Sequence, residues 1–268
     1  VMKYFFTMIN FLLIVGCAQS TPSQRFGEGN LEDLNITNIS PTFASGTLPY
    51  KGEVVMAKQL RGHRMMYIGP IKAIAIEVLL QGSITALRLK NKKQKLEEHA
   101  DEVLKTFDGT LNNIKIAELS DLLTAINAQS EGKFLVHFSP KLVVSQDAKF
   151  ITLQTSVDIT HKQSKETYSN LISVSDEIEV DELSVDSEAA RQLLKRKFSN
   201  LLKTTYDVVV MTMPNVMKKC GSMSQTKYQK SGRSKVILGR SCGTIAEKKI
   251  FLTNRNNFLA IPSYLVEI

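Results

Sequence analysis

The chain has 268 residues, of which 43% are hydrophobic and 7% aromatic, so it can bury the core of one large domain or of two small ones. Its net charge is +8, and the excess of cations lies in the last third. Fifteen Lys and Arg fall between Arg191 and Arg255, whereas Asp176 to Glu188 holds seven acidic residues and no cation. Such a basic region predicts contact with anionic lipid headgroups, peptidoglycan carboxylates or an acidic protein, with a solvated basic surface as the plain alternative.

The N-terminal segment has the pattern of an export signal. Lys3 precedes an uncharged, largely apolar run from Tyr4 to Val15. This run is shorter than the roughly 20 residues that a helix needs to cross a bilayer. We therefore expect residues 1–16 to be a signal peptide rather than a transmembrane helix, and we do not expect an exported chain to bind nucleic acid.

The signal ends in Ile14-Val15-Gly16-Cys17. This run resembles the lipobox of bacterial lipoproteins, in which an aliphatic residue, a small or aliphatic residue and Gly or Ala precede an obligatory Cys. The resemblance implies transfer of diacylglycerol to the sulfur of Cys17, cleavage between Gly16 and Cys17, and palmitate-type acyl chains that hold the protein on a membrane. Because Ala18 stands where Asp would retain a lipoprotein in the inner membrane, the resemblance favours the periplasmic face of the outer membrane, with the inner membrane as the alternative.

Composition divides the rest of the chain into three segments. Residues 17–49 hold Cys17 and a polar tether, residues 50–214 an α+β domain, and residues 215–268 a small β-rich segment packed on it. Apolar periodicity predicts strands at 74–80, 134–144, 151–159, 168–174, 235–238, 249–253 and 258–262, and helices at 90–107, 113–128 and 187–210. The expected fold class is α+β, with mostly antiparallel strands, about three helices and a small β-meander at the C-terminus.

Two cysteines remain once Cys17 is acylated. An even pair in an oxidising compartment predicts a disulfide between Cys220 and Cys242, with two free buried thiols as the alternative. No His/Cys cluster with metal-ligand spacing is present, so neither a metal nor a cofactor is expected.

The sequence contains no recognised catalytic motif. A candidate basic contact patch lies in the C-terminal segment, where cations alternate with apolar residues: Lys227, Lys230, Arg233, Lys235 and Arg240. Candidates for acid–base chemistry at strand ends are His137, Asp158 and His161, although no carboxylate partner can be assigned to a histidine from sequence alone.

The resulting hypothesis is a lipid-anchored periplasmic envelope protein with a non-catalytic binding or assembly role. A lipid-anchored hydrolase acting on cell-wall or polysaccharide material is the alternative, and an accessory subunit of a transport or secretion complex is the third.

Overall fold

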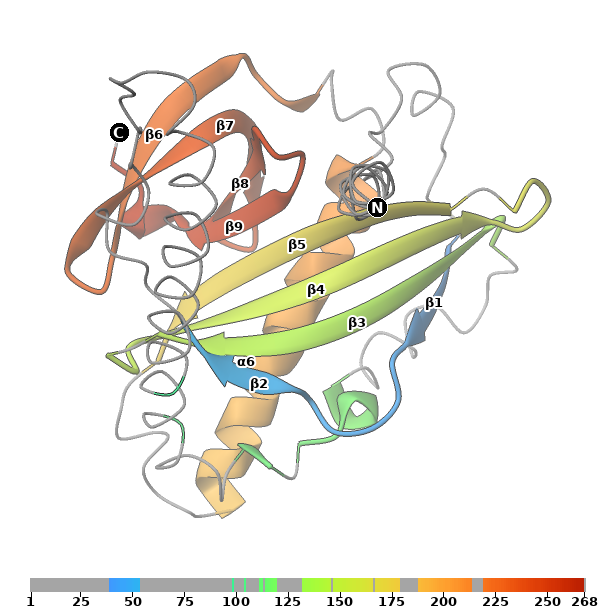
Figure 1. Cartoon of the computed structure of the whole chain (residues 1–268), viewed down its shortest axis with the longest axis horizontal. Coiled ribbons are helices and arrows are strands. Elements are labelled where there is room, and N and C mark those ends of the chain that lie inside the picture. Colours follow the sequence, from blue (N-terminus) through green and yellow to red (C-terminus); the bar gives the residue numbers. More distant parts are fainter. Residues whose placement is uncertain are drawn as a thin grey trace, which may run out of the picture.

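The structure of the chain is a computed structural model, and it describes residues 39–53, 98, 104, 111–112, 114–119, 132–145, 147–165, 167–178, 188–213 and 219–267. Nine strands form one mixed sheet (Figure 1). They are β1 (Ile39–Phe43), β2 (Tyr50–Gly52), β3 (Phe134–Val144), β4 (Phe150–His161), β5 (Thr167–Glu177), β6 (Met223–Lys230), β7 (Arg233–Ile245), β8 (Lys248–Thr253) and β9 (Phe258–Pro262). One long helix, α6 (Glu188–Asp207), continues into a π-helical turn, η3 (Val208–Thr212), and a 3-10 turn, η4 (Ser263–Leu265), follows β9.

An antiparallel meander of β3, β4 and β5 forms the centre of the sheet. It confirms the hairpin expected at 134–144 and 151–159 and the strand expected at 168–174. β1 and β2 follow one another along the outer side of β3, both parallel to it. On the other side, β5 pairs in parallel with β9, so the sheet continues in the order β5-β9-β8-β7-β6.

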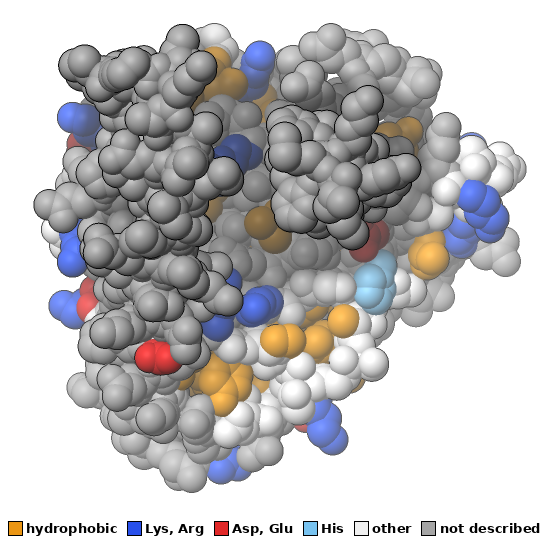
Figure 2. Space-filling view, viewed as in Figure 1, with side chains coloured by type: hydrophobic (Ala, Val, Ile, Leu, Met, Phe, Trp, Pro, Cys, Tyr) orange, Lys and Arg blue, Asp and Glu red, His pale blue; other side chains and the backbone are white. Residues whose placement is uncertain are grey.

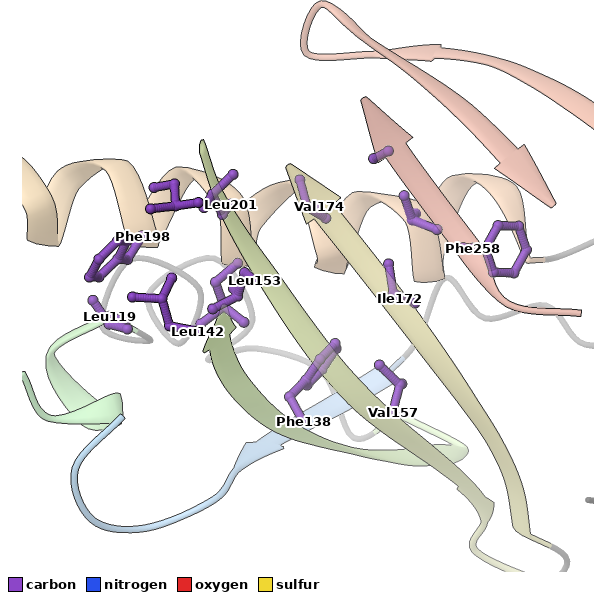
Figure 3. Packing of buried hydrophobic residues seen from close by; sticks show 14 of the residues in the cluster. Leu119, Phe138, Leu142, Leu153, Val157, Ile172, Val174, Phe198, Leu201 and Phe258 are labelled. Atoms are coloured by element: carbon purple, nitrogen blue, oxygen red, sulfur yellow. The ribbon is translucent and has the colours of Figure 1, made fainter. Parts of the chain in front are cut away.

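Helix α6 lies behind the central strands in Figure 1 and buries one face of the sheet. The apolar positions of β3, β4 and β5 alternate, so that Leu142, Leu153 and Val174 share the face that meets the helix. Phe198 and Leu201 of α6 are buried in the same cluster (Figure 3). This burial is the main favourable term for the fold, and it explains why the amphipathic segment expected at 187–210 forms a helix here.

The expected fold class is wrong. Within the described ranges a single mixed sheet dominates and α6 is the one long helix, instead of three helices packed on mostly antiparallel strands. The strands expected as a separate C-terminal β-meander belong to the main sheet, because β9 pairs with β5. Periodicity identifies a strand but not its neighbour, so parallel pairs between distant segments leave no local signal.

Several expectations fall outside the described residues. These are the signal peptide, Cys17, the strand at 74–80, and most of the helices at 90–107 and 113–128. Strand β1 lies in the last part of the segment expected as a tether. Among the helices that the structure does describe, none has the length and apolar character to cross a bilayer.

The sheet curls until its two ends meet. Glu53, which follows β2, pairs through Oε2 with Lys230 Nζ of β6 and through Oε1 with Lys235 Nζ of β7, both at 3.0 Å. Lys230 Nζ also lies 3.5 Å from Thr152 Oγ1 and 6.0 Å from the centre of the Phe150 ring, both on β4. The β6–β7 hairpin is therefore folded over the face of the sheet opposite α6.

Candidate functional site

A pocket of about 460 Å³ lies where the last turns of α6 meet β5, β8 and β9. Its wall combines Lys203, Thr204 and Asp207 of α6 with Asp176 of β5, Lys248 of β8 and Glu247 of the β7–β8 turn. Its volume is in the range of pockets that hold small molecules.

Two ion pairs face this pocket. Lys248 Nζ lies 2.8 Å from Asp176 Oδ2, and the side chain of Lys248 is only 11% exposed. Lys203 Nζ lies 2.8 Å from Asp207 Oδ2, one helical turn apart on α6. An ammonium carries three N–H donors and a carboxylate accepts several hydrogen bonds, so each pair retains capacity for a further partner.

Tyr264 of η4 stands at the rim of the pocket. Its Oη donates to Glu177 Oε2 at 2.7 Å. Burial and this hydrogen bond to a carboxylate both raise the pKa of the Tyr264 hydroxyl. The rim hydroxyl therefore stays protonated at neutral pH.

The backbone around the pocket departs from regular geometry in two places. Asp207 is the last residue of α6 before the π-helical turn η3, a conformation found frequently at functional sites. The two residues of the β7–β8 turn, Ala246 and Glu247, have φ values of 46° and 62°. The β6–β7 turn has a similar backbone, with φ values of 54° and 65°, but there Gly232 takes the second position. Both central positions of this turn type need positive φ, so Ala246 and Glu247 carry backbone strain at the wall of the pocket.

We expect Glu247→Gly to stabilise the protein by about 0.5–1 kcal/mol, because glycine adopts positive φ without the steric cost of a Cβ. The matched change Gly232→Ala should lower the free energy of unfolding by a similar amount. Urea unfolding followed by circular dichroism measures both. A destabilised Glu247→Gly protein would show that the Glu247 side chain makes a stabilising contact.

A row of polar side chains crosses the face of the sheet opposite α6. Thr42, His137, Asp158 and Ser169 are register partners on β1, β3, β4 and β5. Thr42 Oγ1 lies 3.1 Å from His137 Nδ1, and Ser169 Oγ donates to Asp158 Oδ1. Figure 2 shows histidine, basic and apolar side chains exposed on this face.

The structure thus brings together two of the three acid–base candidates. His161 lies on the other face of β4, where its ring packs on Phe134 and its Nδ1 meets Ser164. Asp158 stands between His137 and Ser169 in the row, so the Ser169 hydroxyl contacts the carboxylate of Asp158 rather than the imidazole. The hydroxyl beside the imidazole is that of Thr42, 3.1 Å from His137 Nδ1, so the order across β1, β3 and β4 is hydroxyl, imidazole and carboxylate.

The disulfide between Cys220 and Cys242 is confirmed, with Cα atoms 4.0 Å apart. It joins the segment before β6 to β7, and the Gly221 amide donates to the Ser241 carbonyl beside it at 2.8 Å. The open end of the β6–β7 hairpin is therefore closed covalently.

The five cations of the expected contact patch lie on two faces of the hairpin. Register pairing places Lys227 and Arg240 on one face, and Lys230, Arg233 and Lys235 on the other. Lys230 and Lys235 are the two cations that pair with Glu53.

Sequence reasoning missed the pocket. Asp176 and Lys248 stand 72 positions apart, and no local pattern connects them. The part of the chain that the structure describes holds no group of three or more His, Cys, Asp or Glu able to bind a metal. No protein-family model, no curated protein and no solved structure matches this chain.

Proposed function

We propose that the chain is a lipid-anchored protein of the bacterial envelope with a non-catalytic binding role, and that the pocket beside α6 holds its ligand. The lipobox-like run ending in Cys17 supports the anchor and the periplasmic face of the outer membrane. The Cys220–Cys242 disulfide supports an oxidising compartment.

The two ion pairs in one pocket are the observation that carries the proposal. A purely anionic ligand would meet the carboxylates of Asp176 and Asp207, and a purely cationic ligand would meet Lys203 and Lys248. A ligand with both an ammonium and a carboxylate, such as an amino acid or a short peptide, can bind a cation and an anion at once. Charge-assisted hydrogen bonds of this kind are stronger than those between neutral groups.

We expect Lys203→Gln to weaken binding of such a ligand by about tenfold, because it removes one charge-assisted hydrogen bond. Lys203 is half exposed, so the change should leave the fold intact. Titration calorimetry of the purified protein with dipeptides, and with acetate and methylamine for comparison, measures the effect. Glu188→Gln, at the far end of the same helix, is the matched control. Equal affinity of the Lys203→Gln and wild-type proteins, or no binding of any zwitterion, would refute the ligand assignment.

A hydrolase acting on cell-wall or polysaccharide material is the second candidate, and the register pairing of His137 with Asp158 on the face of the sheet opposite α6 favours it. Turnover of peptidoglycan or a polysaccharide by the purified protein, abolished by His137→Gln, would select it over the binding role.

A further inference from the structure

One face of the β6–β7 hairpin exposes three large apolar side chains. Met223, Val236 and Leu238 are 47%, 58% and 42% exposed. They are three of the seven large hydrophobic residues that are exposed within the described chain. Register places them on one face together with Lys227 and Arg240, since Lys227 is opposite Val236 and Met223 is opposite Arg240. These five residues are called the outer hairpin face below.

The charged side chains of the hairpin itself are all cations. Residues 221–245 contain five Lys and Arg and no Asp or Glu. Glu53 pairs with two cations of the inner side, Lys230 and Lys235, whereas Lys227 and Arg240 lie on the outer side beside the apolar residues. One carboxylate reaches the edge of this face, where Glu267 Oε1 accepts a hydrogen bond from Gln229, two residues from Lys227 on β6.

The hairpin presents this face rigidly. The Cys220–Cys242 disulfide closes its open end. The ion pairs of Glu53 join its inner side to the segment after β2, Lys230 Nζ lies 3.5 Å from Thr152 Oγ1 of β4, and Val266 bridges to Tyr228 along the outer edge of β6. A face held in this way binds a flat surface without a further loss of chain entropy.

We propose that the outer hairpin face docks on an anionic phospholipid surface. Lys227 and Arg240 meet the lipid phosphates, while Met223, Val236 and Leu238 enter the boundary between headgroups and acyl chains. The apolar residues favour a bilayer over an acidic polymer, because a polymer offers carboxylates but no apolar phase for the aliphatic side chains. An acyl chain and a basic apolar face together make a stable attachment where either alone is weak. The proposal is independent of the pocket and its ligand.

The chain contains no Trp, so one introduced tryptophan reports on a single position. We place Val236→Trp in the full chain, bind it to vesicles of phosphatidylcholine with and without phosphatidylglycerol, and measure the emission maximum and quenching by brominated lipid. Leu193→Trp, at an exposed apolar position of α6, is the matched control. We expect a blue shift and strong quenching for Val236→Trp only, and only with phosphatidylglycerol. Adding Lys227→Glu and Arg240→Glu should lower the fraction of docked hairpin about tenfold, since each cation near an anionic surface contributes to partitioning.

Three results would overturn the proposal. Equal quenching of the two tryptophans would show that the anchor alone brings the chain to the vesicle. Equal quenching with and without phosphatidylglycerol would remove the role of the cations. A blue shift that appears without vesicles and grows with protein concentration would assign the face to a second copy of the chain. Binding of a zwitterionic ligand in the pocket would be unaffected in each case.

Discussion

Glu53→Gln should lower the free energy of unfolding by about 3 kcal/mol, because it leaves the ammonium of Lys230 buried without its counter-charge. The Lys230 side chain is 10% exposed and that of Glu53 is 21% exposed. Glu53 also pairs with Lys235, so one substitution breaks both contacts between the two ends of the sheet. Urea unfolding of the two proteins at neutral pH measures the difference.

The effect should depend on pH in a defined direction. Burial alone would raise the pKa of Glu53, but the charges of Lys230 and Lys235 and their hydrogen bonds outweigh burial and hold the pKa below its ordinary 4.5. The ion pairs therefore contribute fully above pH 4.5, and their contribution is lost as the pH falls through the lowered pKa of the folded state. The stability difference between wild type and Glu53→Gln should shrink over that range.

Other groups with shifted pKa values are present in both proteins, so the difference in stability between wild type and Glu53→Gln reports on Glu53. Asp147 also has a lowered pKa, because hydrogen bonds from Ser145 and Ser231 outweigh its burial, but it is present in both proteins. Burial lowers the pKa of Lys230, and the charge and hydrogen bond of Glu53 oppose this effect in part.

Two control variants make the test sharp. Glu188→Gln removes an exposed carboxylate that lies 4.0 Å from Arg191, and it should change stability by less than about 0.5 kcal/mol. Glu53→Gln combined with Lys230→Met should recover part of the loss, because it removes the unpaired buried charge. If Glu53→Gln unfolds no more readily than Glu188→Gln, the contact between the ends of the sheet contributes little to the fold.

Phe198→Ala should lower the free energy of unfolding by about 4 kcal/mol, because it opens a cavity between α6 and the sheet. The Phe198 ring is fully buried in the main core cluster, beside Leu119 and Leu142 (Figure 3). Phe198→Leu should cost less, since it fills part of the same space, and it remains measurable if the alanine variant does not fold. Chemical denaturation of the purified variants measures whether Phe198→Ala lowers the free energy of unfolding more than Phe198→Leu does.

The control is Leu193→Ala on the same helix. Leu193 is 37% exposed, so Leu193→Ala removes less buried surface than Phe198→Ala, leaves no enclosed cavity and should cost about 1 kcal/mol. Similar losses for Phe198→Ala and Leu193→Ala would mean that α6 is not held by the core that the structure shows.

The elements with strong local patterns were predictable. Alternating apolar residues identified β3, β4 and β5, and the 3.6-residue stripe identified α6. β6 was missed because its eight residues include Lys227, Lys230 and no run of β-branched residues. It forms a strand because β7 and the disulfide hold it in place.

The candidate site was less predictable than the elements around it. His137 and Asp158 each stood out, but only the β3–β4 register shows that they are opposite one another and that His161 is not. No pattern in the sequence predicted the pocket, because its charged residues come from separate elements, mainly α6, β5 and β8, and none of them belongs to a motif.

The sequence alone determined the central meander, the long helix and the cysteine pair, because each depends on residues within a short stretch or on a count. Only the tertiary structure determined the parallel pairing of β5 with β9, the pocket, and the contact between the two ends of the sheet. Glu53 and Lys235 are 182 positions apart, and their attraction exists only after the sheet has curled. Contacts between residues so far apart depend on how the whole chain folds, and the periodicity of apolar residues within a short segment does not predict them.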